Sequence, residues 1–302
     1  MSFFKKWYTY QKERFPVLIY GLYVFAIVFA VFCFNSHLIL TYETIINWKL
    51  LIPMFVVTFL QFLMVRIVDE FKDYEEDCKY RSYRPVPRGL ITLKELKILF
   101  AICILLQLAI TFFATEKIIS FTRLGILWMF FVVMSKSFFM KKIIEKHILF
   151  EVALDELMMP ILVWYLSSFL KYINPTYSLY SYIDMQSMLP LLCMSYIVSW
   201  IVEIARKIRC REDEEKGVKT YTAVFGIKKA MLILFVLETI LMIIQLSILK
   251  GYILPIICLY LAVNLINLRF VAKQNRKFAK LTELSANIYV FIVYFSMILL
   301  II

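Results

Sequence analysis

Long apolar runs, separated by short polar segments, follow one another along almost the whole chain. A helix that spans a bilayer needs about 20 mostly apolar residues. Nine runs meet this length, near residues 15–35, 49–68, 93–114, 121–140, 148–170, 187–208, 229–249, 251–271 and 284–302. The run 251–271 is the least distinct, because only Lys250 and Gly251 separate it from the run before. The pattern predicts an all-α, polytopic membrane protein with a bundle of nine transmembrane helices, forming one domain over residues 1–302.

The composition agrees with this pattern. The chain of 302 residues is 62% hydrophobic, whereas soluble domains hold about 45–50% apolar residues. No small-residue cleavage site follows the first run, so we expect a retained membrane span there rather than a signal peptide. The lipid bilayer is therefore the first partner that the sequence predicts.

Basic residues gather on alternate sides of the predicted spans. Of the 34 Lys and Arg residues, 28 lie in the N-terminal segment and in every second loop, 5 lie in the other loops, and Arg66 lies inside a span. Cytoplasmic loops carry such an excess, so we expect a cytoplasmic N-terminus and, in a bacterium, insertion in the inner membrane. Anionic inner-leaflet lipids explain the net charge of +12, and we expect no nucleic-acid partner.

Histidine and cysteine offer little material for catalysis. The chain has only His37 and His147, and no two of its 6 cysteines are spaced like a metal knuckle. A zinc site and a Ser-His-Asp triad are therefore disfavoured. Cys78 and Cys210 fall in predicted cytoplasmic loops, where thiols stay reduced.

Three aspartates, Asp69, Asp73 and Asp77, follow the second apolar run at intervals of four residues. On a helix this spacing places them along one face, with a drift of about 40° per step. Like charges at this spacing repel by a few tenths of a kcal/mol per pair, so a positive partner is expected. Lysines of a solvated loop are one candidate. Mg²⁺ is the other, since it usually takes one or two carboxylates together with substrate phosphates.

Basic residues come directly after this acidic stripe. Arg81 and Arg84 follow it, and the run Arg84-Pro85-Val86-Pro87-Arg88-Gly89 predicts a stiff turn with a sharp end. Arginine forks match phosphate oxygens. Arg66, one turn before the stripe, either reaches a diphosphate or neutralises the acids beside it. Acids followed by arginines at the mouth of a helix bundle favour a site for a lipid diphosphate.

This segment resembles the first signature of the UbiA-type intramembrane prenyltransferase superfamily. That signature reads Asn-Asp-x-x-Asp-x-x-x-Asp and is followed by an Arg-Pro-x-Pro-x-Gly turn. In this chain Asp69 stands where the family usually has Asn, and Glu70 where it usually has Asp. Both changes keep an oxygen donor. The predicted nine spans also match the family, and the resemblance covers most of the chain, with signature loops near 69–92 and 206–228.

The family's second signature, Asp-x-x-x-Asp followed by Gly-Ile/Val-x-Thr, is only partly matched. Residues 217–220 read Gly-Val-Lys-Thr and fit the turn. Counting back from that turn, Asp213 takes the second aspartate position and Arg209 the first. A shift of one residue would bring Glu214 and Cys210 there instead. The resemblance therefore implies an altered second metal shell.

Two further acids lie within or near the predicted spans. Glu203 is either an oxygen donor for the site or an ion-pair partner of Arg206 or Lys207, which would equally suit a diphosphate. Asp155 lies early in the run 148–170. An ionisable residue inside a membrane span is a functional hypothesis by default, so Asp155 either orients an acceptor or pairs with nearby lysines.

The resemblance implies a Mg²⁺-dependent prenyltransferase that uses a prenyl diphosphate donor and a small acceptor, with an aromatic or quinone-precursor acceptor favoured. Metal and arginines would stabilise the charge on the leaving diphosphate, and aromatic faces would attract the carbocation. The residues it assigns are Asp69, Asp73 and Asp77 for catalysis and metal, Asp213 for metal, Arg66, Arg81, Arg84, Arg206 and Lys207 for the diphosphate, and Asp155 and Glu203 for the acceptor.

Other functions stay open at this point. The altered second signature is also compatible with a non-catalytic scaffold or a lipid-binding protein derived from a prenyltransferase, and a non-aromatic acceptor such as a sugar phosphate or glycerol phosphate fits the same residues. A transporter would show paired Gly/Pro-broken helices in two halves. A CDP-alcohol phosphotransferase would show an Asp-x-x-Asp-Gly-x-x-Ala-Arg run. The sequence has neither pattern.

Overall fold

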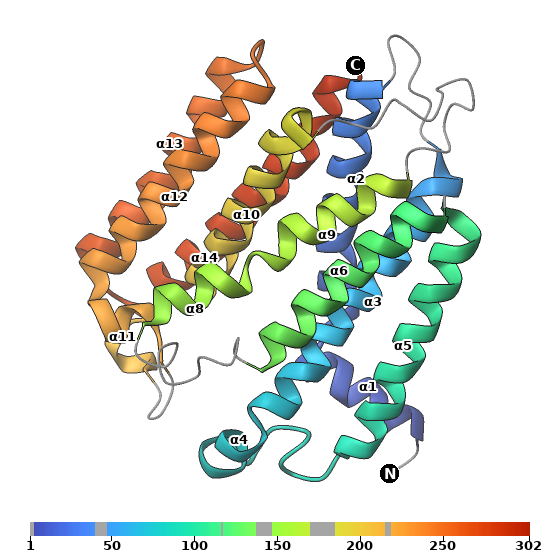
Figure 1. Cartoon of the computed structure of the whole chain (residues 1–302). Helices are drawn as coiled ribbons and strands as arrows, with labels where there is room; N and C mark the ends of the chain where they lie inside the picture. Colours follow the sequence, from blue (N-terminus) through green and yellow to red (C-terminus); the bar gives the residue numbers. More distant parts are fainter. Residues whose placement is uncertain (1–2, 40–46, 116, 137–146, 170–184, 215–218) are drawn as a thin grey trace. The chain divides into compact units, whose positions relative to one another are not determined.

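The computed structural model describes residues 3–39, 47–115, 117–136, 147–169, 185–214 and 219–302, and all regular structure in these ranges is helical (Figure 1). The all-α prediction is therefore confirmed. The helices are α1 (Phe3–Arg14), α2 (Val17–Ile39), α3 (Trp48–Lys72), α4 (Tyr74–Tyr80), α5 (Leu93–Ala114), α6 (Lys117–Ser135), α8 (Ile148–Asp155), α9 (Met158–Leu166), α10 (Met185–Arg206), η3 (Arg211–Asp213), α11 (Tyr221–Phe225), α12 (Ile227–Ile248), α13 (Ile253–Lys273), α14 (Arg276–Phe295) and η4 (Ser296–Leu300).

The described residues contain eight helical segments that are long and apolar enough to cross a membrane. The last of these segments, Arg276–Leu300, combines α14 with η4. The fifth predicted span, 148–170, is instead divided into α8 and α9, with a break at Glu156 and Leu157. Pro160 explains the break, since it has no N–H to donate to the carbonyl of Glu156 and is tolerated only in the first turn of the helix that follows. The count of nine spans is therefore approximate.

The predicted limits of the spans hold best where a cap fixes them. The predicted span 93–114 coincides with α5, because Thr92 and Glu95 form a capping box at its start. By contrast α14 begins at Arg276, well before the predicted residue 284, because its first two turns are polar and Asn275 caps them. The predicted ends at residues 140 and 170 lie outside the described residues.

The chain forms two compact units. The first comprises Met1–Phe29, Ile45–Phe138 and Tyr165–Thr176, and the second comprises Ala30–Thr44, Phe139–Trp164 and Tyr177–Ile302. The single domain over 1–302 stays a prediction.

In the first unit, α3, α5 and α6 pack against one another. Gln107 of α5 connects all three, since its amide nitrogen donates to the Val57 carbonyl at 2.9 Å and its amide oxygen accepts from Trp128 Nε1 at 3.0 Å. In the second unit, α10 packs on α12 and α14, and α13 packs on the same two helices. Asn267 of α13 donates to Glu238 of α12 at 2.9 Å. Interhelical hydrogen bonds of this kind hold helices together where apolar burial alone does not.

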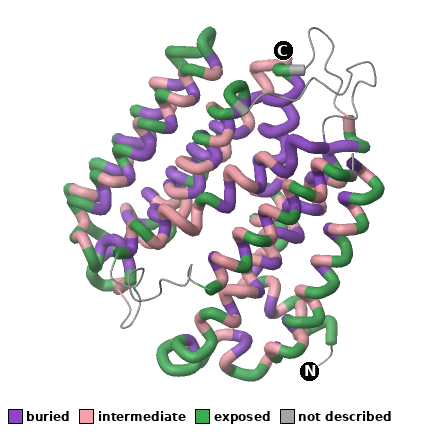
Figure 2. Tube along the Cα trace, in the orientation of Figure 1, coloured by how far each residue is buried: buried purple, intermediate pink, exposed green. Residues whose placement is uncertain are grey.

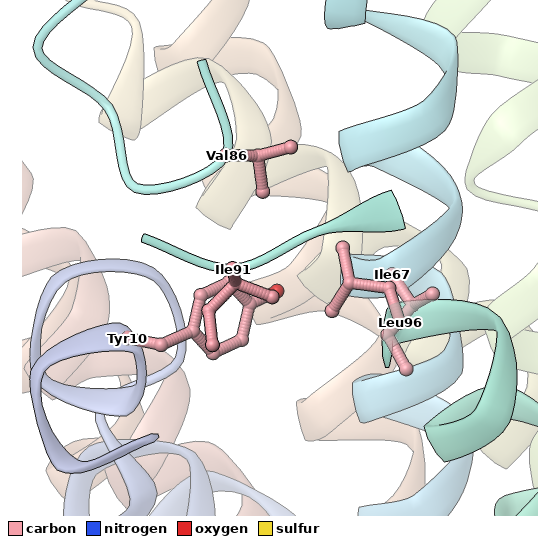
Figure 3. Close-up of a cluster of buried hydrophobic side chains, with 5 residues drawn as sticks. All are labelled: Tyr10, Ile67, Val86, Ile91 and Leu96. Carbon is pink, nitrogen blue, oxygen red and sulfur yellow. The ribbon is translucent and has the colours of Figure 1, made fainter. Parts of the chain in front are cut away.

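An apolar cluster at one end of the first unit holds the loop after α4 in place. Tyr10 of α1, Ile67 of α3, Leu96 of α5, and Val86 and Ile91 of the loop are all buried and lie together (Figure 3). Most of α4 is exposed, whereas the loop mixes exposed, intermediate and buried residues (Figure 2). The first signature is thus anchored through a few apolar side chains.

Candidate functional site

The first signature runs from the end of α3 through α4. The helix is interrupted at Asp73, which has φ −95° and ψ 0°. Even so, Asp73 N donates to the Asp69 carbonyl at 2.9 Å, and Asp77 N donates to the Asp73 carbonyl at 2.8 Å. The one-turn spacing therefore continues through the join, and the three aspartates follow one another as the sequence predicts, on two helices rather than one.

The three aspartates have different surroundings. Asp77 is buried, and its carboxylate accepts from Arg81 Nη1 at 3.0 Å and from Arg84 Nη1 at 2.6 Å. The Asp69 side chain is 43% exposed and lies 3.7 Å from Arg66 Nη1. Asp73 is half-buried. Asp69 and Asp73 are thus accessible from outside the protein, whereas the buried Asp77 is paired with two arginines, which leaves one net positive charge.

Glu70, the second residue of the signature, faces inward. Its side chain is 1% exposed and accepts from Arg14 Nε at 2.5 Å and from Arg66 Nη2 at 3.2 Å. In this structure Glu70 is an internal counter-ion rather than an accessible oxygen donor. Arg66 lies between Glu70 and Asp69, so neutralisation of the neighbouring acids, one of its two predicted roles, is what the structure shows. Its role toward a diphosphate stays a prediction.

The second signature belongs to the second unit. Gly217 and Val218 lie outside the described residues, but Thr220 caps α11 by accepting from Ala223 N at 3.1 Å. The Glu214 carboxylate accepts from the hydroxyl groups of Thr220 and Thr222, at 2.6 Å and 2.7 Å. Glu214 is therefore bonded to the start of α11.

Asp213 lies at the end of η3 with its own partners. It accepts from Cys210 Sγ at 3.3 Å and lies 3.3 Å from Nε of Arg276 in α14. Arg209, at the family's first aspartate position, has its backbone N–H bonded to Thr222 Oγ1 at 3.0 Å. The structure therefore gives Asp213 an arginine partner, and its role as a metal ligand stays a prediction.

Glu203, near the end of α10, forms the ion pairs that the sequence offered as one alternative. Its carboxylate contacts Arg206 Nη2 at 2.5 Å and Lys207 Nζ at 2.6 Å. The Lys207 ammonium also lies 5.8 Å from the centre of the Tyr221 ring. All three charged residues of this segment are thus brought together, with one net positive charge.

The break between α8 and α9 lies in the same unit as this cluster. Tyr196 of α10 donates to the Ala153 carbonyl at 2.8 Å, which joins α10 to α8. Asp155 is the last residue of α8. Glu156, which follows it, is the first residue of the break between the two helices. The acceptor role of Asp155 stays a prediction, and Glu156 is an additional acid beside it.

The binding of a divalent cation would depend on the oxygen donors that the first signature offers. Among the described residues, no three His, Cys, Asp or Glu side chains converge on one point that could hold a metal ion. Asp69 and Asp73 nevertheless offer accessible carboxylates one turn apart. Mg²⁺ usually takes one or two carboxylates together with substrate phosphates. The residues therefore fit a Mg²⁺ ion that is bound together with a diphosphate.

Sequence reasoning did not identify Arg14, the Arg14–Glu70 pair or Glu238 as functional candidates. Arg14 and Glu70 are 56 residues apart, and no local spacing connects them. Glu238 is the only acid within the run 229–249. An acid inside a membrane span indicates a candidate functional residue, so the sequence does contain a signal for it. It is fully buried and bonded to Asn267.

The two loop cysteines should differ in reactivity. Cys78 is exposed and Cys210 is buried. Burial, together with the hydrogen bond to Asp213, raises the pKa of the Cys210 thiol, so less of the reactive thiolate is present at pH 7. In single-cysteine variants in inverted vesicles, an impermeant maleimide should label Cys78 rapidly and Cys210 at least about tenfold more slowly, with the Cys210 rate rising as the pH is raised.

Intact cells provide the control for sidedness, and unfolding in detergent should make the two rates similar. Labelling of either cysteine in intact cells would contradict the predicted cytoplasmic position of the two signatures.

These features define an integral, multi-pass membrane protein in which acids and arginines gather at the ends of helices. The model of the UbiA prenyltransferase family matches residues 26–291. The chain therefore belongs to the UbiA prenyltransferase family, as the resemblance of its first signature implied.

Solved structures show the same fold. A structure of digeranylgeranylglyceryl phosphate synthase is 18% identical, with 98% of this chain and 99% of that chain covered and a TM-score of 0.60. A UbiA homologue from Aeropyrum pernix K1 is 12% identical, with 91% and 96% covered and a TM-score of 0.61. A UbiA homologue from Archaeoglobus fulgidus, bound to DMAPP and Mg²⁺, is 14% identical, with 93% and 98% covered and a TM-score of 0.50. No curated protein matches the chain.

Proposed function

We propose that this family member transfers an isoprenyl group from a prenyl diphosphate to a small acceptor in a Mg²⁺-dependent reaction, with an aromatic or quinone-precursor acceptor favoured. The observation that carries the proposal is the arrangement of the first signature. Accessible Asp69 and Asp73 precede Asp77, whose carboxylate holds Arg81 and Arg84. The complex of the Archaeoglobus fulgidus homologue with DMAPP and Mg²⁺ supports the choice of donor and metal.

The proposal assigns each group of residues a task. Asp69, Asp73 and Asp77 of the first unit would bind metal, and Asp213 of the second unit is likewise assigned to metal binding. The bound metal would supply positive charge to the leaving diphosphate. Arg66, Arg81, Arg84, Arg206 and Lys207 would bind the diphosphate oxygens, for which guanidinium forks are well suited. Asp155 and Glu203 would orient the acceptor.

The reaction exchanges one bond for another. The bond between the allylic carbon and the diphosphate oxygen breaks, and its electron pair leaves with the diphosphate. A new bond forms between that carbon and a nucleophilic carbon or oxygen of the acceptor, which loses a proton. The arginines contribute because they stabilise the negative charge that develops on the leaving group.

The charge distribution supports a cytoplasmic position for this chemistry. The N-terminal segment and both signature loops carry the excess of basic residues, so we place them on the cytoplasmic side of the membrane. A prenyl diphosphate fits this placement, because its charged head can stay at the wet end of the bundle while its tail enters the apolar interior.

The proposal is tested by incubating purified, detergent-solubilised protein with prenyl diphosphates of several chain lengths and a panel of acceptors, with Mg²⁺ or with EDTA. We expect a prenylated acceptor, identified by its mass, and equimolar pyrophosphate in the Mg²⁺ samples only. Absence of product and of pyrophosphate for every pair would support the alternative, a non-catalytic lipid-binding protein. Arg209 at the family's first aspartate position is the observation that favours this alternative.

A further inference from the structure

Helix α1 is joined to the first signature by charged contacts with three different segments. Lys6 lies 2.5 Å from Glu95 of α5, and Glu13 lies 2.8 Å from Arg88 of the loop after α4. The third contact is the pair Arg14–Glu70, which joins α1 to α3. The partners are 89, 75 and 56 residues away in the sequence. This helix is therefore part of the structure around the signature rather than a separate tail.

Apolar packing fixes the same helix. Tyr10 is 2% exposed and belongs to one buried cluster with Ile67, Val86, Ile91 and Leu96 (Figure 3). Burying an aromatic ring removes a large apolar area from water and therefore favours the docked position of α1. The apolar contact orders α1, and the order of α1 in turn fixes where Arg14 at its end can reach.

Arg14, Glu70 and Arg66 form a buried cluster of three charges. The Arg14 Nε and Arg66 Nη2 atoms both approach the same oxygen of Glu70, at 2.5 Å and 3.2 Å. The three side chains are only 10%, 1% and 13% exposed. Arg14 Nη2 and the nearby Tyr10 hydroxyl are buried and have no hydrogen-bond partner. The cluster thus holds more donors than its single carboxylate satisfies.

The charge balance of this cluster determines whether the positive charge of Arg66 can act on a bound anion. Two guanidinium groups and one carboxylate leave one net positive charge next to Asp69, which lies 3.7 Å from Arg66 Nη1. Without Arg14, the charge of Glu70 would rest on Arg66 alone. Arg66 already contacts Glu70 through Nε at 3.3 Å and Nη2 at 3.2 Å, and opposite charges at this distance attract more strongly when no other charge shares them, so Arg66 would then be held more firmly to Glu70.

We propose that Arg14 is a positioning residue for donor binding: by neutralising Glu70, it leaves Arg66 with a positive charge that is available to the diphosphate. This inference rests on the proposed function of the first signature. It gives the N-terminal helix a task in substrate binding, although that helix lies outside both signatures. Arg14 itself acts through Arg66 and need not touch the substrate.

The test measures the affinity of full-length protein for pyrophosphate in the presence of saturating Mg²⁺ by titration calorimetry. Pyrophosphate is the probe because its binding depends neither on the prenyl chain length nor on the acceptor. Arg14→Ala should weaken binding about tenfold, which corresponds to about 1.4 kcal/mol. Arg14→Lys should weaken it less, since a lysine keeps the charge but loses the fork.

A charge-removal variant separates this role from a merely structural one. In the double variant Arg14→Ala with Glu70→Gln, the buried carboxylate that holds Arg66 is gone and only the longer contact to the more exposed Asp69 remains, so pyrophosphate affinity should return to within about threefold of the wild type. Glu13→Gln is the matched control on the same helix, because its ion pair with Arg88 is more than a third exposed, and surface pairs contribute little. Its affinity should not change.

The outcomes are distinguishable. Equal affinity of the wild type and Arg14→Ala would overturn the inference and leave the proposed function intact. A weakened Arg14→Ala that Glu70→Gln does not rescue would also overturn it, because the effect would then be structural. No pyrophosphate binding by the wild type would overturn both. The expected affinity changes without any prenylated product would support the role of Arg14 and contradict the transferase.

Discussion

Replacing Asp73 by alanine should reduce prenyl transfer at least about 100-fold, or about 2.7 kcal/mol of transition-state stabilisation, while the solubilised protein stays folded. Asp73 lies at the junction of α3 and α4 and is half-buried, so the variant removes a carboxylate without emptying a core position. Its backbone contacts to Asp69 and Asp77 do not depend on its side chain. Initial rates at saturating Mg²⁺ and the thermal unfolding midpoint measure the two parts of this prediction.

Glu75→Ala is the matched control for this variant. Glu75 is exposed in the first turn of α4, two residues from Asp73. Its replacement by alanine removes the same negative charge as Asp73→Ala does. We expect less than a twofold change in rate. If Asp73→Ala kept the wild-type rate, or if Glu75→Ala lost as much activity, the aspartate stripe would not be the metal site.

Replacing Arg84 by alanine should have the second largest effect, because it alters both stability and donor binding. Arg84 makes the shorter of the two arginine contacts to Asp77, with Nη1 2.6 Å from Oδ2 of the carboxylate. The Asp77 side chain is only 2% exposed. Removing one partner of a buried ion pair costs about 3–5 kcal/mol when the charge is left alone. Arg81 still contacts Asp77, so we expect a loss of about 1–3 kcal/mol and a Michaelis constant for the donor at least about tenfold higher.

A second substitution separates the two effects. Arg84→Lys keeps a positive charge beside Asp77 but loses the guanidinium fork, so it should retain much of the stability that Arg84→Ala loses, but not the donor binding. Arg88→Ala is the control, since its ion pair with Glu13 is more than a third exposed. It should change the free energy of unfolding by about 0.5 kcal/mol or less. Wild-type donor affinity in Arg84→Lys would mean that residue 84 serves only as a positive charge beside Asp77 and that its fork does not bind the diphosphate.

The membrane helices could be predicted from the sequence because a bilayer imposes a minimum length of apolar residues. This is why the span 93–114 coincides with α5. The same criterion cannot detect α1, which is short and polar, or the polar first turns of α14. It also counts residues 148–170 as one span, although Pro160 interrupts the hydrogen bonding between α8 and α9.

The candidate site could be predicted where its contacts are local. The spacing of Asp69, Asp73 and Asp77 survives the break in the helix, and Glu203 pairs with basic residues three and four positions later, as helical geometry allows. Contacts between distant segments could not be predicted in this way. Asp213 with Arg276 is such a pair, and Arg14 with Glu70 is another. Only the packing of α14 and α1 brings these groups together.

The most direct test of the account is whether the aspartates of the first signature bind a divalent metal together with the donor. Mn²⁺ can replace Mg²⁺ and be counted by electron paramagnetic resonance in the purified protein with farnesyl diphosphate, geranyl diphosphate or pyrophosphate. The account predicts bound Mn²⁺ with coupling to phosphorus in the wild type and in Glu75→Ala, and its loss in Asp73→Ala. Undiminished Mn²⁺ binding with the same phosphorus coupling in Asp73→Ala would contradict the account.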